Sequence, residues 1–297
     1  MSRAWLEQRE RGTLGALRLI AWITKGLGYR VGRALLYPIS LYFVVFSTKA
    51  RAASRDFLTR ALERAPTWRD VFRHYHTFAA TLLDRVEVLS GRFDPFEITV
   101  HGRAAIESAM GGGRGCLLLG AHLGSFEFVR AVADDKRALV VNVVMHEANA
   151  DKITRWAREI SPAIAERIIA PGRVDTLLRV RECLARGEAV AMLADRPVGT
   201  AASRRAPFLG APASFPEGPF QVALALGVPV VLFFGLYRQA RCYDIHFELF
   251  DAGSRVDRVE REAVLDRMID RYAKRLETYA RAAPYNWFNF YDFWRHE

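Results

Sequence analysis

The segment from Gly115 to Glu127, GCLLLGAHLGSFE, joins a short apolar run to a polar turn. The run over 115–120 predicts a buried strand, because a few consecutive apolar residues between glycines are typical of a strand covered on both faces. Gly124 permits a sharp bend, and Ser125 is a residue type that caps helix N-termini. The segment therefore predicts a strand, a turn and a helix, with His122 at the carboxyl end of the strand.

From residue 96 onward, the chain alternates strand patterns with helix patterns. Strands are predicted over 96–100, 115–120, 138–144, 168–169, 188–194, 228–236 and 243–250, the last two as a pair. Helices are predicted before the glycines at 111–113, from about 125, around 151–160, and over 174–185, about 219–226 and 258–281. This alternation predicts an α/β fold with a mixed, mostly parallel sheet flanked by helices. Such sheets bind ligands at the carboxyl ends of their strands.

The N-terminal part of the chain differs from the rest in its charge and in its apolar content. No acidic residue occurs between Arg11 and Arg55, and the run over 34–47, ALLYPISLYFVVFS, is the most apolar of the chain. It is shorter than the roughly 20 residues of a membrane-spanning helix. A buried helix pair and an interfacial or re-entrant anchor both fit, and the basic flanks and aromatic residues favour membrane contact. We therefore predict a membrane-associating helical segment over 1–64 and an α/β domain over 65–297, beginning with a long helix over 68–90.

The overall composition indicates an anionic partner in a reducing compartment. The 297 residues carry 43 Lys and Arg against 33 Asp and Glu, which gives a formal charge of +10. Because basic residues alternate with apolar ones near the N-terminus, a membrane surface fits better than nucleic acid. The three cysteines are far apart, and the N-terminus has no secretory signal pattern, so no disulfide framework is expected.

His122 and Glu127 are the candidate catalytic pair. A bend at Gly124 would let the Glu127 carboxylate fold back onto the imidazole, fix its tautomer and leave it free to accept a proton. The alternative is a histidine that only caps a helix. Other chemistries lack their motifs: the chain has no G-x-S-x-G, no G-K-[ST], and His146-Glu147 does not continue to HExxH. No metal and no cofactor is therefore expected.

Four segments resemble one family in the same order. His122-x4-Glu127 resembles the HX4(D/E) signature of glycerolipid and lipid A late acyltransferases. Asp195-Arg196 resembles the substrate-binding block of that family, and GPFQVALALGVP over 218–229 resembles its downstream helix and strand. YNWFNFYDFW over 285–294 is similar to the aromatic ending of the lipid A branch. Phe126, where the family usually has Trp, and Pro197 depart from the pattern and leave the acceptor open.

The resemblance implies a glycerolipid acyltransferase-like fold and transfer of a fatty acyl group to a hydroxyl or amine of a lipid or saccharolipid. His122 is then the general base, oriented by Glu127. The substrate-binding residues it implies are Arg173, Asp195, Arg196, Gly124 and Ser125. Acyl carrier protein is the expected donor, with acyl-CoA second, at the cytoplasmic face of the bacterial inner membrane. A thioesterase or lipid-ester hydrolase using the same His–Glu pair and a non-enzymatic lipid-binding module remain alternatives.

Overall fold

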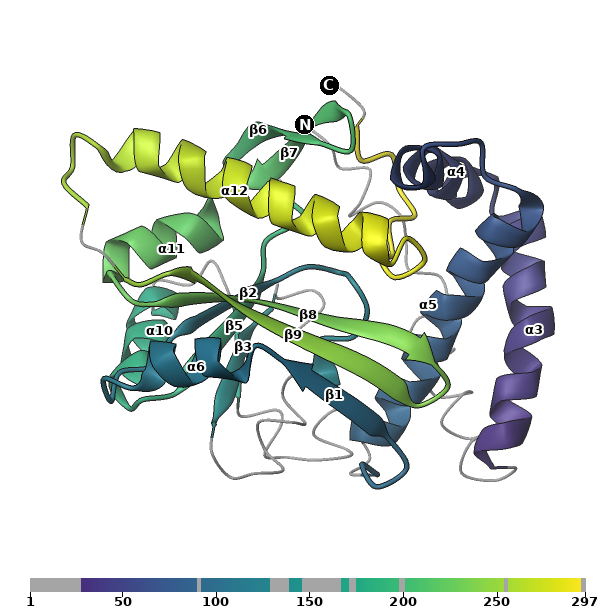
Figure 1. The fold of residues 1–297 in the computed structure, drawn as a ribbon, viewed down its shortest axis with the longest axis horizontal. Coiled ribbons are helices and arrows are strands. Elements are labelled where there is room, and N and C mark those ends of the chain that lie inside the picture. Colours follow the sequence, from purple (N-terminus) through teal and green to yellow (C-terminus); the bar gives the residue numbers. More distant parts are fainter. Residues whose placement is uncertain are drawn as a thin grey trace.

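The computed structural model describes residues 28–89, 92–128, 139–145, 167–170, 175–197, 201–253 and 256–294. A seven-stranded sheet with the order β1-β9-β8-β2-β5-β3-β4 forms its centre (Figure 1). The strands are β1 (Glu97–His101), β2 (Leu117–Gly120), β3 (Val141–Val144), β4 (Ile168–Ile169), β5 (Ala189–Leu193), β8 (Val230–Gln239) and β9 (Cys242–Asp251). The strands from β8 to β4 are parallel, whereas β9 is antiparallel to β8 and parallel to β1. The predicted α/β class and mostly parallel sheet are confirmed.

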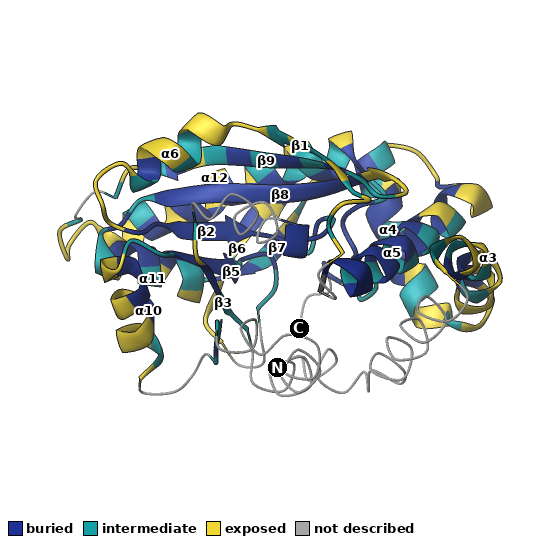
Figure 2. Ribbon diagram, turned by 90° about the horizontal axis from the view of Figure 1, so that it is seen from below, coloured by how far each residue is buried: buried dark blue, intermediate teal, exposed yellow. Residues whose placement is uncertain are grey.

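Helices cover both faces of this sheet. The helices α10 (Thr176–Ala185), α11 (Gly218–Leu226) and α12 (Arg261–Ala282) share one apolar core, and α6 (Arg103–Met110) belongs to the other. Side chains alternate along each strand, so that Leu117 and Leu119 join the first core and Leu118 joins the second. Both faces of β2 and β8 are buried (Figure 2), which explains why these strands are continuous apolar runs in the sequence.

Most predicted elements are present within the described residues. The helix predicted over 68–90 is α5 (Trp68–Leu89), and the predicted strand pair is β8 with β9. The helix around 151–160 lies outside the described residues. A hairpin of β6 (Ser203–Phe208) and β7 (Ala211–Pro216) was not predicted. It turns through Leu209 and Gly210, which both have positive φ, as a two-residue hairpin loop requires.

The three N-terminal helices lie together at one end of the sheet (Figure 1). The helix α3 (Tyr29–Phe46) packs along α5, and α4 (Thr48–Leu62) contacts α5 and α12. Arg51 of α4 donates to the carbonyls of Val44 and Val45 and so satisfies acceptors at the end of α3. Within the described part of the chain, no helix alone has the length and apolarity of a membrane span. Together α3 and α4 meet these criteria, but the pair is bent by 96°.

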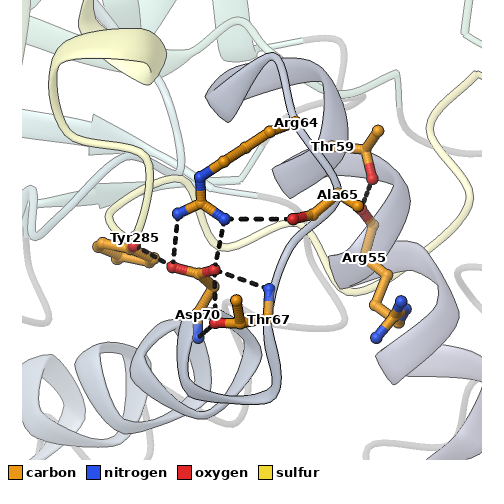
Figure 3. A network of polar contacts seen from close by, with 7 residues as sticks. All are labelled: Arg55, Thr59, Arg64, Ala65, Thr67, Asp70 and Tyr285. Atoms are coloured by element: carbon orange, nitrogen blue, oxygen red, sulfur yellow. Dashed lines mark hydrogen bonds and ion pairs between the residues drawn. The ribbon is translucent and has the colours of Figure 1, made fainter.

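A buried carboxylate ties the start of α5 to the C-terminal segment (Figure 3). Asp70 accepts hydrogen bonds from the Arg64 guanidinium at 2.8 and 3.2 Å and from the Tyr285 hydroxyl at 2.6 Å. Thr67 and Asp70 also exchange backbone and side-chain hydrogen bonds, as in a helix capping box. These hydrogen bonds, that from Arg64 foremost, hold the pKa of Asp70 below its ordinary value. Residue 285 is thereby fixed just before the aromatic stretch that reaches the candidate site.

His74 is buried between α4, α5 and the C-terminal segment. Its Nδ1 lies 2.8 Å from the Ser54 hydroxyl, and its Nε2 lies 2.9 Å from the carbonyl oxygen of Trp287. Burial lowers the pKa of His74 from 6.5 to about 4. His74 therefore links α4 to the C-terminal segment in the interior of the protein.

Acidification is expected to destabilise the fold through His74. Between pH 6.5 and about 4 the unfolded chain binds a proton that the folded chain does not, so this contribution to stability is lost as the pH falls. Urea unfolding at several pH values measures the effect. In a His74→Gln variant, the fall in unfolding free energy across this range should be shallower than in wild type. Equal slopes for the two proteins would contradict the assignment.

Candidate active site

The turn after β2 is held by backbone contacts on two sides. Gly124 has a φ of +72° and donates its N–H to the carbonyl oxygen of Asn286 at 2.8 Å. The N–H of Ser125 donates to Gly235 of β8 at 2.8 Å, and the carbonyl of His122 accepts from Phe288 at 3.0 Å. The turn therefore lies between β8 and the C-terminal segment, which fixes the position of the His122 backbone.

Gly124→Ala is expected to damage both stability and activity. A Cβ at this position would lie 1.8 Å from the carbonyl oxygen of Gly235, and the positive φ disfavours any L side chain. Strain and displacement together should cost about 2–4 kcal/mol of unfolding free energy. Denaturant unfolding measures the loss. Gly112→Ala is the matched control, because a Cβ at Gly112 would meet nothing within 4 Å. Similar stability of the two variants would be evidence against the proposed close contact.

His122 is paired with Asp195 from the neighbouring strand end. Gly120 of β2 is in register with Leu193 of β5, so His122 and Asp195 each follow their strand by two residues. Asp195 Oδ1 lies 2.8 Å from His122 Nδ1, and Oδ2 accepts the His122 backbone N–H at 3.1 Å. Oδ2 also accepts Nε1–H of Trp287 at 3.0 Å. Adjacent parallel strands thus place a fully buried carboxylate against an imidazole whose side chain is 37% exposed.

The electrostatics of this pair suit a general base. Burial alone would raise the pKa of Asp195, but His122, Arg196 and Trp287 hold it below its ordinary value, so Asp195 is ionised. An ionised carboxylate only accepts hydrogen bonds, which places the imidazole proton on Nδ1 and the lone pair on Nε2. Burial and the positive charge of Arg196 lower the pKa of His122, partly offset by Asp195. His122 is consequently neutral at pH 7 and can accept a proton.

Glu127 follows the Gly124 turn by three residues, and the structure pairs it with Arg85 of α5. Its Oε1 is 2.5 Å from Arg85 Nη2, and both side chains are mostly buried. The Ser125 hydroxyl donates to the other Glu127 oxygen at 3.4 Å, a long contact. The carboxylate that contacts the imidazole is therefore Asp195 instead of the predicted Glu127.

The other predicted substrate-binding residues have different positions. Arg196 donates to the carbonyl of Phe288 at 2.6 Å, and its Nε lies 3.5 Å from Asp195 Oδ2. It anchors the C-terminal segment and adds positive charge beside the pair. Gly124 and Ser125 form the turn itself, and Arg173 lies outside the described residues.

Two contributors to the site were not predicted as such. Trp287 supports Asp195, and Arg85 binds Glu127. Asn286 exchanges hydrogen bonds with the backbone of Tyr237 at 2.7 and 3.1 Å and so ties the C-terminal segment to β8. The aromatic run at 285–294 was the available signal for Trp287. No sequence spacing relates Arg85 to Glu127.

The mostly parallel sheet therefore presents, at the carboxyl ends of two adjacent strands, a buried carboxylate in contact with a partly exposed imidazole, an arrangement found in α/β enzymes. The chain matches the family model of bacterial lipid A biosynthesis acyltransferases over residues 65–296. It belongs to this family and is an acyltransferase. A search of curated proteins found no match.

Proposed function

We propose that the protein transfers a fatty acyl group from an acyl carrier protein thioester to a hydroxyl or amine of a lipid A-type saccharolipid. The observation that carries this proposal is the contact between His122 Nδ1 and Asp195 at adjacent strand ends, in a chain of the lipid A acyltransferase family. Nε2 of His122 takes the proton from the hydroxyl or amine of the acceptor lipid. The oxygen or nitrogen of that group attacks the thioester carbon at the same time. The C–S bond breaks, and the departing thiolate takes the proton from the imidazolium.

The two carboxylates receive separate proposed roles. Asp195 orients the imidazole and stabilises the imidazolium, because it contacts Nδ1 directly. Glu127, predicted from the HX4E motif to hold His122, is 2.5 Å from Arg85 and keeps that guanidinium beside the site. Arg85 is close enough to lower the pKa of His122, and an anionic group of the acceptor would meet it there. The formal charge of +10 supports the acidic carrier protein as donor.

We further propose that the segment over 1–64 associates with the cytoplasmic face of the bacterial inner membrane. The α3 helix buries only a narrow stripe, whereas Tyr37, Tyr42, Phe43 and Phe46 are exposed, Phe46 by 68%. Lys49, Arg51 and Arg55 follow this apolar surface at the start of α4. Aromatic side chains beside basic residues fit the headgroup region of an anionic bilayer. The family match begins at residue 65, which supports the predicted boundary of the α/β domain.

Phe46→Asp is expected to weaken vesicle binding about tenfold or more, because it places a charge on the apolar surface of α3. Sedimentation with vesicles containing anionic phosphatidylglycerol measures the partition coefficient. Val259→Asp is the control, since Val259 is 94% exposed in a turn before α12. Equal partitioning of both variants and wild type would exclude α3 as the membrane-contacting surface.

The acyl-transfer proposal is tested by release of carrier thiol from acyl carrier protein, with and without a lipid A precursor fraction. Lipid-dependent release that is lost in His122→Ala, with an acylated lipid found by mass spectrometry, is the expected result. Equal release without lipid would indicate a thioesterase. No release from carrier protein or CoA donors would contradict the proposal and favour a lipid-binding module.

A further inference from the structure

A second cluster of ionisable side chains lies at the β1 edge of the sheet, on β1 and β9. His101 and His246 are directly opposite each other in the parallel β1–β9 pair, and their rings stack with centroids 4.5 Å apart. Asp244 precedes His246 by two residues and therefore points to the same face of β9. Ligand atoms of the three side chains all lie within 4.8 Å of one another. Only β8 separates β9, which carries two of these residues, from β2, the strand that leads to His122.

These three side chains form a donor set suited to a transition-metal ion. Two imidazoles and one carboxylate are ligands that Zn²⁺ accepts in tetrahedral sites. Ligand atoms around such an ion are about 3.3 Å apart, given metal–nitrogen distances of about 2.0–2.1 Å. His101 is exposed, so its side chain has room to rotate and close the separation.

The neighbouring side chains restrain His246 but leave the three ligand side chains accessible. Tyr279 of α12 packs against His246 with ring centroids 5.2 Å apart, which restrains that imidazole. Asp244 pairs with Arg238 at 2.6 Å, but the Arg238 side chain is 58% exposed and free to move to solvent. Glu248, the next residue on this face, is engaged by Arg275 and Tyr279. The carboxylate available for an ion is therefore that of Asp244.

We propose that His101, Asp244 and His246 bind one divalent ion of the zinc class, with water completing the coordination. The ion would link the edge strand β1 to β9. The register of β1 and β9 places the two histidines, which are distant in the sequence, on one face with Asp244. The site therefore needs no C-x2-C or HExxH spacing in the sequence. This inference is independent of acyl transfer at His122.

Cobalt titration of the full-length protein, stripped of metal by a chelator, tests the proposal. Co²⁺ should bind with one equivalent and give the strong visible d–d bands of a tetrahedral site, and Zn²⁺ should displace it. His101→Ala and Asp244→Asn should each weaken binding by at least about tenfold. Zn²⁺ should raise the melting temperature of wild type but not of His101→Ala.

Two controls make the result decisive. His122→Ala removes the histidine that contacts Asp195 and should keep the cobalt site unchanged. His101 is exposed, so the metal-free melting temperature of His101→Ala should equal that of wild type. Absence of saturable Co²⁺ and Zn²⁺ binding, identical titrations of wild type and His101→Ala, or loss of the site in His122→Ala would each overturn the proposal.

Discussion

Asp195→Asn is expected to lower kcat/KM for acyl transfer by about 10³–10⁴-fold, comparable to the loss of the orienting aspartate in a hydrolase triad. Oδ2 of Asp195 accepts two N–H groups, from His122 and Trp287, while Oδ1 faces His122 Nδ1. An asparagine would therefore keep its oxygen at the Oδ2 position and turn its NH2 group toward the imidazole. Nδ1 would then have to accept a hydrogen bond, which moves the ring proton to Nε2 and removes the general base.

Glu127→Gln is the matched variant, because it also replaces a buried carboxylate with an amide of the same shape. It removes the charge facing Arg85 but leaves the Asp195–His122 contact intact. We expect a smaller loss of kcat/KM than for Asp195→Asn. The reverse order, with a large loss in Glu127→Gln and a small loss in Asp195→Asn, would show that Glu127 orients His122 during turnover, as the HX4E motif predicts.

The pH profile separates catalytic orientation from a structural effect. Because burial and Arg196 lower the pKa of His122, the acid limb of kcat/KM should lie below pH 6.5. Asp195 opposes that shift because it favours the imidazolium. In Asp195→Asn, the acid limb of the remaining kcat/KM should therefore move to a still lower pH. An unchanged limb in Asp195→Asn would indicate that Asp195 only supports the fold.

The sequence predicted the elements of the fold better than the contacts between them. The strand over 115–120 is a continuous apolar run and the helix over 68–90 has a helical apolar period, and both patterns are local in the sequence. The β6–β7 hairpin was missed because Pro207 and Pro212 stand in register across it, and proline usually argues against a strand. The parallel pairing of β1 with β9 depends on long-range packing, for which no local pattern exists.

In the candidate site, too, the sequence predicted positions better than contacts. His122 follows a strand pattern, and its position after β2 agrees with that pattern. Asp195 also follows its strand by two residues, but it was named only through the family resemblance, and only the β2–β5 pairing shows that it contacts His122. The spacing of Glu127 gave no information on whether it would turn toward His122 or toward Arg85. That choice depends on where α5 crosses the end of the sheet.

Trp287→Ala is expected to lower the free energy of unfolding by about 3–5 kcal/mol, the range for deleting a buried aromatic side chain. Trp287 is fully buried and has edge contacts with Phe57, Phe208 and Phe293 at centroid distances of 4.9–5.1 Å. Denaturant unfolding measures this cost. The large cavity would also disturb Asp195, so the alanine variant alone does not separate stability from catalysis.

Trp287→Phe makes that separation, because it keeps most of the ring and removes only the indole N–H that donates to Asp195. Loss of a hydrogen bond to a charged group should reduce kcat/KM about tenfold or more, with a smaller stability loss than in the alanine variant. Trp294→Phe is the control: Trp294 belongs to the same aromatic cluster but donates to the carbonyl of Phe208 at 3.1 Å. If both phenylalanine variants lost activity equally, the cluster would act on the site through packing alone. A selective loss in Trp287→Phe would place the C-terminal segment among the elements that position the Asp195–His122 pair.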